Sequence, residues 1–309
     1  MNLVSLSSYG APKGAIVGSI QTRDGVKLRY ARWPGLTGAR GTVLLLQGRA
    51  EFIEKYFEVV EELIARGFGV LTFDWRGQGL SDRLLSDRRK GHVESFAQYD
   101  LDFNTILEQV VFPECRPPYV GLAHSTGGAI LLRAASQGKL PIDRLVLTSP
   151  MIAVPYLSGS GFARLALRSL VASGLGTKYI PGGRAEIMDL RPFVGNRRTS
   201  DPARYARCAQ LVMAEPALGL GSPTIGWTAA AVEATREFSD ADFARRVAPP
   251  CLIIAAAGDR IVSTAASRAF ADSSTSIEYR VVANSKHELL MERDDLRSQF
   301  WAAFDPFVA

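Results

Sequence analysis

The sequence has few residues of the kinds that bind metals or form disulfide bonds: 3 cysteines and 3 histidines among 309 residues. Cys115, Cys208 and Cys251 lie far apart and form no C-x-x-C pair, which excludes a disulfide framework and favours a reducing cytoplasm. No cluster of His, Cys and Asp has the spacing of metal ligands. The segment Gly77-Gln78-Gly79 lacks the third glycine of a dinucleotide-binding fingerprint. We therefore predict a protein without a metal or a cofactor.

Long apolar runs and a strong charge imbalance are also missing. The segment Met1–Ser5 is not a basic stretch followed by an apolar one, and no apolar run approaches the roughly 20 residues that a membrane helix needs. The net charge is +5, and the basic clusters are short and lack interleaved aromatic residues, which argues against nucleic acid as a partner. We expect a cytoplasmic protein whose contact with an anionic membrane, at its inner face, is peripheral. The oligomeric state stays open.

Short apolar runs alternate with segments of helical periodicity along most of the chain. This alternation predicts an α/β fold with a mostly parallel central sheet flanked by helices. Between residues 152 and 244 glycine and proline interrupt short helical pieces, and no buried strand is evident. We interpret residues 1–151 and 245–309 as two parts of one core, and residues 152–244 as a helical cap inserted between them. The expected core strands span residues 42–46, 70–73, 119–122, 145–148, 251–255 and 277–282.

Residues 120–128 (VGLAHSTGG) join a predicted strand to a predicted helix through a tight turn. Ser125 lies in this turn, with the small residues Ala123 and Gly127 two positions before and after it. A serine in such a strand-turn-helix segment stands exposed at the edge of a sheet, where it can act as a nucleophile. The backbone N–H of Thr126 then points toward a developing oxyanion. An ordinary loop with a solvated serine is the alternative for this segment taken alone.

A serine nucleophile needs a base and a carboxylate that orients the base. His124 adjoins Ser125, so we expect its side chain to point away from the hydroxyl, and His92 lies upstream. His287 follows the last predicted strand, at the sheet edge where α/β active sites gather. Asp259 follows the preceding strand, although such an aspartate is also common in turns and helix N-caps. Ser125, Asp259 and His287 each end a different strand and therefore predict a catalytic triad.

A second oxyanion donor is expected in the loop after the first core strand, residues Gln47–Glu51. Gly48 lets the backbone approach a substrate closely. The backbone N–H of Arg49 is the candidate donor. The Arg49 side chain has two possible roles, an ion pair with Glu51 or a contact with an acyl or phosphate group, and the sequence does not decide between them.

Six segments carry a resemblance to a known family: residues 47–51 (QGRAE), 73–81 (FDWRGQGLS), 91–96 (GHVESF), 124–128 (HSTGG), 258–262 (GDRIV) and 287–292 (HELLME). In these segments the chain resembles the α/β-hydrolase superfamily, within its bacterial lysophospholipase and monoacylglycerol lipase branch. The resemblance extends from about residue 40 to the C-terminus, interrupted by the predicted cap. It implies an α/β-hydrolase fold with a helical cap over an acyl pocket.

The resemblance also implies roles for individual residues. Ser125 corresponds to the nucleophile, Asp259 to the acid and His287 to the base, and the backbone N–H groups of Arg49 and Thr126 correspond to the oxyanion donors.

Three further positions bear on the resemblance. Gln47 stands where many members have histidine, and Ala123 replaces the first glycine of the nucleophile turn, but neither change removes a reacting group. In the cap, Trp227 resembles a tryptophan that faces the substrate, and anchoring the core is its alternative role.

The sequence thus predicts a serine carboxylic-ester hydrolase that works through an acyl-enzyme intermediate. The resemblance implies a single-chain acyl lipid as substrate, either a lysophospholipid or a monoacylglycerol. One alternative is another α/β-hydrolase with the same triad, such as a small-ester esterase, a thioesterase or an acyltransferase. A non-catalytic binding protein on this fold is a second alternative, and the complete triad argues against it. The serine at position 125 argues against dehalogenases and epoxide hydrolases, which have aspartate there.

Overall fold

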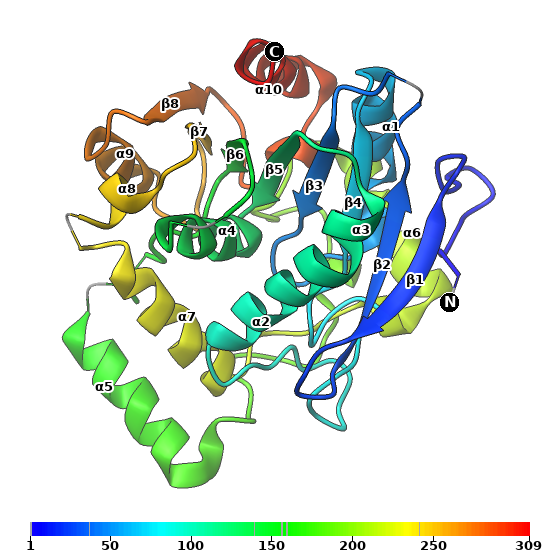
Figure 1. The fold of residues 1–309 in the computed structure, drawn as a ribbon. Helices are drawn as coiled ribbons and strands as arrows, with labels where there is room; N and C mark the ends of the chain where they lie inside the picture. Colours follow the sequence, from blue (N-terminus) through cyan, green and yellow to red (C-terminus); the bar gives the residue numbers. More distant parts are fainter. Residues whose placement is uncertain (1, 37, 139, 156, 159, 241) are drawn as a thin grey trace.

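A mostly parallel sheet runs through the centre of the molecule (Figure 1). The computed structural model describes residues 2–36, 38–138, 140–155, 157–158, 160–240 and 242–309. Within these residues the sheet has eight strands in the order β1-β2-β4-β3-β5-β6-β7-β8. β2 pairs antiparallel with β1 and β4, and the other neighbouring strands pair parallel, which confirms the predicted α/β fold. The strands are β1 (Ile16–Gln21), β2 (Lys27–Trp33), β3 (Thr42–Leu46), β4 (Gly69–Phe73), β5 (Tyr119–His124), β6 (Arg144–Thr148), β7 (Cys251–Ala256) and β8 (Ile277–Val282).

The central parallel strands are apolar because both faces of the sheet are covered. β3, β4, β5 and β7 are buried at every position. Successive side chains point to opposite faces, so Leu44 and Leu46 of β3 pack into one core cluster while Val43 and Leu45 pack into the other.

Two layers of helices cover the sheet (Figure 1). One core cluster joins the sheet to α1 and α10, and the other joins it to α2, α4, α8 and α9. A 3-10 turn, η1 (Ile53–Tyr56), leads into α1, and a second one, η6 (Leu289–Met291), precedes α10. A π turn, η2 (Leu107–Val111), and the short α3 (Phe112–Glu114) follow α2. The remaining bounds are α1 (Phe57–Ala65), α2 (Ala97–Ile106), α4 (Thr126–Ser136), α8 (Phe243–Arg246), α9 (Thr264–Asp272) and α10 (Asp294–Phe307).

The chain between β6 and β7 forms helices and turns, and none of its described residues joins the sheet. α5 and α7 lie together at one side of the molecule, whereas α6 lies at the other side (Figure 1). Leu211 and Val212 of α6 pack against Phe52, which precedes α1. The segment therefore crosses from one side of the core to the other. Besides α8, its elements are α5 (Gly161–Leu170), η3 (Val171–Leu175), η4 (Met188–Leu190), α6 (Pro202–Ala214), η5 (Pro216–Leu218) and α7 (Ile225–Glu237).

The N-terminal hairpin of β1 and β2 lies outside the strands predicted from the sequence. β1 is partly exposed along its length and lacks a continuous apolar run. The turn contains Asp24-Gly25, and Gly25 has a φ of 85°. An Asp-Gly pair between alternating residues is the local signal that predicts such a hairpin.

Among the described residues, no helix is both long enough and apolar enough to span a lipid bilayer.

Candidate active site

Ser125 occupies the sharp turn between β5 and α4. Its backbone has φ 51° and ψ −114°, a conformation that residues other than glycine rarely adopt. Two hydrogen bonds hold it: Ser125 N–H donates to Thr148 O over 3.1 Å, and Met151 N–H donates to Ser125 O over 2.9 Å. The neighbouring strand β6 and the residues after it thus fix the strained turn.

Small side chains around the turn are a steric requirement. A Cβ atom on Gly127 would lie 2.6 Å from the carbonyl oxygens of Leu46 and Gln47, so no larger residue fits there. Ala123 is buried in β5 and its methyl group is accommodated, so the departure from glycine at this position leaves the turn intact.

The predicted reacting side chains meet at the carboxyl edge of the sheet. His287 Nε2 lies 3.0 Å from Ser125 Oγ, and His287 Nδ1 lies 2.7 Å from Asp259 Oδ2. The serine hydroxyl can therefore donate to the imidazole, whose other N–H donates to the carboxylate. The structure brings together three residues from loops that are far apart in the sequence.

A turn after β7 keeps the Asp259 side chain ionised. Burial would raise its pKa, but the hydrogen bond from His287 and two backbone N–H donors, Ile261 at 2.8 Å and Val262 at 3.0 Å, outweigh burial and hold the pKa below its ordinary value. Gly258 N–H donates to Ser285 O over 2.9 Å, which joins the aspartate loop to the histidine loop.

Two backbone N–H groups are available beside Ser125. Thr126 is the first residue of α4, where helical N–H groups have no partner within the helix. Within the described ranges, neither the Thr126 N–H nor the Arg49 N–H donates to a protein acceptor. Gly48 brings the second loop close, because a Cβ atom on Gly48 would lie 3.2 Å from Ser125 Cβ. These N–H groups are free to bind an oxyanion.

Side chains from the 73–81 segment hold the loop that carries Arg49. Gln78 Nε2 donates to Gly48 O over 2.8 Å and to Glu51 O over 3.1 Å, and Trp75 Nε1 donates to Gln47 O over 3.0 Å. The Gln47 side chain turns to the sheet, where Nε2 donates to Thr72 Oγ1 over 3.2 Å. Sequence reasoning gave Trp75 and Gln78 no such role.

A buried charge network lies beneath the same loop. Glu51 accepts from Gly48 N–H over 2.5 Å, from Tyr56 Oη over 2.7 Å and from Lys55 Nζ over 2.7 Å. Lys55 Nζ also lies 2.8 Å from Glu288, the neighbour of His287. Glu51 is therefore paired with Lys55, and the possible Arg49–Glu51 ion pair does not form.

The Arg49 side chain extends toward the segment between β6 and β7. Its Nη2 donates to Gly221 O over 3.1 Å, and its guanidinium carbon lies 5.1 Å from the centre of the Trp227 ring. Trp227 is buried, packs near Phe96, and donates from Nε1 to Tyr99 Oη over 3.0 Å. The tryptophan thus touches both the core and the loop of Arg49.

The other two histidines, His124 and His92, are buried and do not take part in the hydrogen bonds that join Ser125, His287 and Asp259. His124 Nδ1 lies 3.1 Å from both Thr148 O and Thr148 Oγ1, and burial lowers the pKa of His124 to about 4, so its ring is neutral. Its ring centre is 4.7 Å from that of His287. His92 Nδ1 lies 2.9 Å from Thr224 Oγ1, and burial lowers its pKa too. His124 supports the His287 ring by packing, and His92 joins the core to the start of α7.

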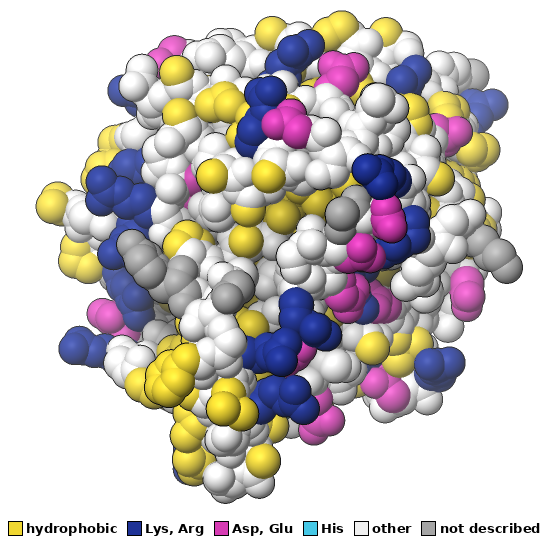
Figure 2. All heavy atoms as spheres, turned by 90° about the vertical axis from the view of Figure 1, so that its left-hand side faces the viewer, with side chains coloured by type: hydrophobic (Ala, Val, Ile, Leu, Met, Phe, Trp, Pro, Cys, Tyr) yellow, Lys and Arg dark blue, Asp and Glu magenta, His cyan; other side chains and the backbone are white. Residues whose placement is uncertain are grey.

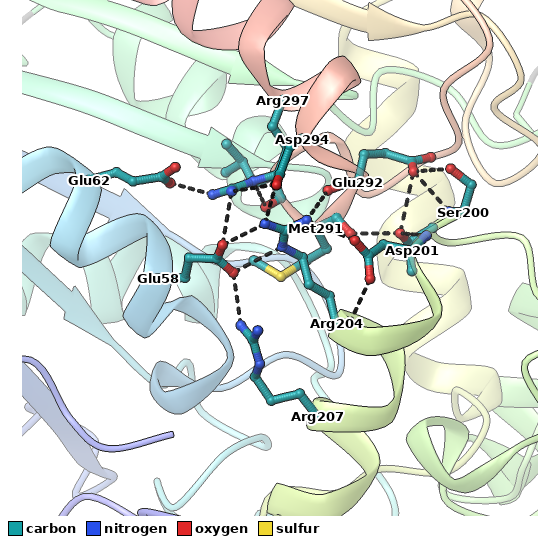
Figure 3. Close-up of polar contacts among 12 residues, drawn as sticks. Glu58, Glu62, Ser200, Asp201, Arg204, Arg207, Met291, Glu292, Asp294 and Arg297 are labelled. Atoms are coloured by element: carbon teal, nitrogen blue, oxygen red, sulfur yellow. Dashed lines mark hydrogen bonds and ion pairs between the residues drawn. The ribbon is translucent and has the colours of Figure 1, made fainter. Parts of the chain in front are cut away.

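Residues 199–204 fix the loop that follows His287 (Figure 3). Glu292 accepts from Lys286 N–H over 2.7 Å and from Ser200 N–H over 2.9 Å. Arg204 Nη1 donates to Glu292 O over 2.8 Å. A segment far from His287 in the sequence therefore sets the position of its loop.

Within the described ranges, no cluster of three or more His, Cys, Asp or Glu side chains could hold a metal ion.

Comparisons with known proteins place this site in a family. The model of the family described as "Serine aminopeptidase, S33" matches residues 37–294. Lysophospholipase L2 of Escherichia coli is 31% identical over 283 residues, which cover 89% of this chain and 82% of the relative. Monoacylglycerol lipase of Mycolicibacterium smegmatis is 27% identical over 275 residues, covering 87% and 88%. The structure of a soluble variant of monoglyceride lipase from Saccharomyces cerevisiae has a TM-score of 0.74 at 21% identity, with 95% of each chain covered, and shares the fold.

Proposed function

The chain belongs to the α/β-hydrolase family described as serine aminopeptidase S33, and from that premise we propose that it is a serine carboxylic-ester hydrolase of single-chain acyl lipids. The observation that carries the proposal is the hydrogen-bonded series of Ser125, His287 and Asp259 at the carboxyl edge of the sheet. The names of the relatives, lysophospholipase and monoacylglycerol lipase, support lysophospholipids or monoacylglycerols as substrates.

The proposed reaction follows from the geometry of the site. His287 Nε2 accepts the hydroxyl proton as Ser125 Oγ attacks the ester carbonyl, and Asp259 stabilises the imidazolium that forms. The N–H groups of Arg49 and Thr126 bind the oxyanion of the tetrahedral intermediate. His287 then gives the proton to the leaving alcohol, and water releases the fatty acid from the acyl-enzyme by the reverse sequence of proton transfers.

The proposal assigns residues 152–244 to a cap over the acyl chain. A cavity of about 890 Å³ lies between α5, η3 and α7, and Phe96, Val171, Ala229 and Ala230 contribute apolar walls. Phe96 also packs 6.3 Å from Trp227, measured between ring centres, so the cavity adjoins the surroundings of Arg49. The lining also includes charged side chains: Glu94, Arg133, Arg168, Glu233 and Glu237. We therefore assign a long acyl chain to the apolar part of this cavity only, and Trp227 is proposed to border the substrate.

The direct test of the triad is loss of ester hydrolysis in Ser125→Ala, with the fold intact by circular dichroism. Release of fatty acid from a long-chain lysophospholipid and from the matching monoacylglycerol is measured side by side. Wild type is expected to cleave at least one of them, with a rate at least a thousandfold above the variant. Ser273→Ala, which changes an exposed serine that hydrogen-bonds to Ala269 O at the end of α9, is the control and retains hydrolysis.

Other outcomes of this experiment separate the alternatives. Cleavage of a short-chain aryl ester without cleavage of either lipid would make the protein a small-ester hydrolase. Full activity in Ser125→Ala would refute the assignment of the nucleophile. Binding of lipid without cleavage of any ester would favour a non-catalytic binding protein.

Helix α5 supports a peripheral membrane contact. Phe162 and Leu165 are 83% and 65% exposed, and Arg164 and Arg168 lie on the same helix. Figure 2 shows exposed apolar side chains near lysine and arginine side chains on the face of the molecule where α5 lies. A helix with apolar and basic side chains together binds anionic lipid surfaces.

The membrane contact is tested by sedimentation with vesicles that contain phosphatidylglycerol. The double variant Phe162→Asp/Leu165→Asp is expected to lose most vesicle binding while it hydrolyses a water-soluble ester at the wild-type rate. Leu36→Asp, which changes an 80% exposed leucine away from α5, is the control and binds as wild type does. Equal binding by all three proteins would refute this contact.

A further inference from the structure

Arg49 carries a guanidinium beside the reaction centre that has no carboxylate partner. Its Nη2 donates to Gly221 O, and its Nη1 reaches only Met188 Sδ, a weak acceptor, at 3.5 Å. In the described part of the chain, no Asp or Glu side chain pairs with it. The acidic groups that act on its charge are the hydroxyls of Tyr99 and Tyr179, and burial raises the pKa of both, to about 12 for Tyr99, so both stay neutral.

One nitrogen of this guanidinium is entirely unused. Arg49 Nε is shielded from solvent and has no acceptor among the described residues. A shielded donor without a partner costs free energy, and a shielded charge without a counter-ion costs more. Burial lowers the pKa of Arg49 to about 10, so the group keeps its charge at neutral pH. The site therefore presents an unneutralised positive charge with a free N–H donor.

Arg83 is a second arginine without a carboxylate partner among the described residues, but all of its guanidinium nitrogens have hydrogen-bond acceptors. Burial also lowers its pKa to about 10. Yet Nε donates to Arg88 O over 2.9 Å, Nη1 to Ser81 O over 3.2 Å, and Nη2 to Gly79 O and Ala217 O over 2.8 and 2.7 Å. Every nitrogen of Arg83 has a carbonyl partner, so its role is to hold segments together. Arg49 differs from Arg83 because its Nε has no hydrogen-bond acceptor among the described residues.

We propose that the Arg49 guanidinium binds the phosphodiester of a lysophospholipid substrate, an inference that rests on the proposed ester hydrolysis at Ser125. The backbone N–H of the same residue faces the ester carbonyl, and its side chain runs toward Gly221 and Trp227. In a lysophospholipid one glycerol unit separates the ester from the phosphate. One long side chain can thus span from the oxyanion to the phosphate of the same molecule.

The chemistry of the guanidinium suits this ligand. Nε and one Nη nitrogen form a planar pair of donors that matches two oxygens of a phosphate. A monoacylglycerol has no anionic group to supply the missing counter-ion. Arg49 therefore selects single-chain lipids with a phosphodiester over neutral ones.

The test compares two esters with the same acyl chain, lysophosphatidylglycerol and monoacylglycerol, each below its critical micelle concentration. Arg49→Met is expected to lower the ratio of their kcat/KM values about ten- to hundredfold, the range for loss of a hydrogen bond to a charged group. Arg49→Lys, which keeps the charge, restores part of the ratio. Arg83→Met is the matched control, and it lowers thermal stability without changing the ratio.

A structural role for Arg49 gives a different result. If the side chain only joins the loop to Gly221 and Trp227, Arg49→Met lowers both kcat/KM values equally and the ratio stays at the wild-type value, which overturns the proposal. If Arg49→Met instead relieves inhibition by the fatty-acid product and leaves the ratio unchanged, the guanidinium binds the product carboxylate, and the proposal is again wrong.

A binding measurement separates this inference from the proposed hydrolysis. The probes are the ether-linked lysophosphatidylglycerol and the matching alkylglycerol, which have no ester to cleave. Calorimetry with the wild type is expected to show tighter binding of the phospholipid, and Arg49→Met removes the difference. If wild type cleaves neither ester, the proposed function fails, while the ether lipids still report whether Arg49 binds the phosphate. Inorganic phosphate alone, added as a competitor, shows whether the acyl chain is required.

Discussion

At the scale of single residues, Glu51 positions the loop that carries Arg49, a proposed oxyanion donor. Its carboxylate accepts from the backbone of Gly48 and from Lys55 and Tyr56, all of them buried. Burial would raise the pKa of Glu51, but the charge of Lys55 and the hydrogen bonds outweigh it and lower the pKa to about 2. The carboxylate stays ionised at neutral pH, so its hydrogen bonds to the loop do not change with pH in that range.

Glu51→Gln should lower kcat about tenfold or more with little change in KM. The amide has one acceptor oxygen and an NH2 group that faces Lys55 or the Gly48 N–H, so the loop shifts. An oxyanion donor acts in the transition state and not in substrate binding, which is why kcat carries the loss. Affinity for an alkyl boronic acid that forms a tetrahedral adduct at Ser125 should fall in parallel. Glu61→Gln, an exposed glutamate nearby, is the control; a rise in KM alone would exclude this positioning role.

The sequence predicts which candidate reacting side chains lie together. It does not predict the residues that hold their loops in place. Ser125, Asp259 and His287 each follow a separate apolar run, and the ends of parallel strands meet at one edge, so local patterns suffice to bring them together. Lys55 lies only four residues from Glu51, but it also pairs with Glu288 beside His287, and that longer-range part of the network is not encoded by a local pattern. The sequence alone did not decide between the two possible roles of the Arg49 side chain, and the pairing of Glu51 with Lys55 in the structure excludes the ion pair.

At the scale of elements, an ion-pair cluster joins α1, α6 and α10 (Figure 3). Glu58 of α1 accepts from Arg204 and Arg207 of α6 and from Arg297 of α10. Burial would raise the pKa of Glu58, but these hydrogen bonds and charges outweigh burial and lower the pKa to about 2. Because Arg204 also contacts Glu292, the cluster continues into the loop of His287.

The stability gained from Glu58 should depend on pH in a defined direction. Its folded-state pKa lies below the ordinary value of 4.5, so its ion pairs stabilise the fold fully above that value and progressively less as the pH falls toward about 2. Glu58→Gln should therefore lower the urea midpoint at neutral pH, and the difference from wild type should shrink steadily in acid. Urea titrations from neutral to acidic pH measure this. A difference that is constant across the range would show that the charge of Glu58 is unimportant.

Elements with a continuous apolar run are predictable from the sequence, and elements that depend on tertiary contacts are not. β3, β5 and β7 are buried on both faces and give unmistakable runs. β1 is an edge strand with partly exposed residues, and α6 is stabilised by arginine pairs and by packing on Phe52. Their stability comes from partners elsewhere in the chain, which a local pattern does not contain.

At the scale of the whole molecule, the segment between β6 and β7 contacts both Arg49 and the loop of His287. Ser125 is only 7% exposed. Arg49 hydrogen-bonds to Gly221 of this segment, and residues 199–204 hold the loop of His287. These contacts set the positions of residues around Ser125.

The proposed site of the acyl chain is the cavity along η3 and α7, and this cavity can be narrowed without touching the proposed triad. Ala229 is half-buried and lines the cavity, so Ala229→Phe fills part of it at little cost to packing. Hydrolysis of long-chain esters should fall at least tenfold, whereas short-chain esters, which do not reach the cavity, should be cleaved at the wild-type rate. Kinetics over a series of acyl lengths measure the shift.

Ala163→Phe is the matched control, because Ala163 lies on α5 outside the lining of this cavity. It adds the same aromatic ring to the segment between β6 and β7 without narrowing the space, so its preference for acyl length should equal that of wild type. If Ala229→Phe and Ala163→Phe have the same profile as wild type, the acyl chain lies elsewhere, and the shielding of Ser125 must serve a path to the site that does not pass between α5 and α7. A shortened preference in Ala229→Phe alone would instead show that the fold uses its inserted helices to measure the length of the lipid.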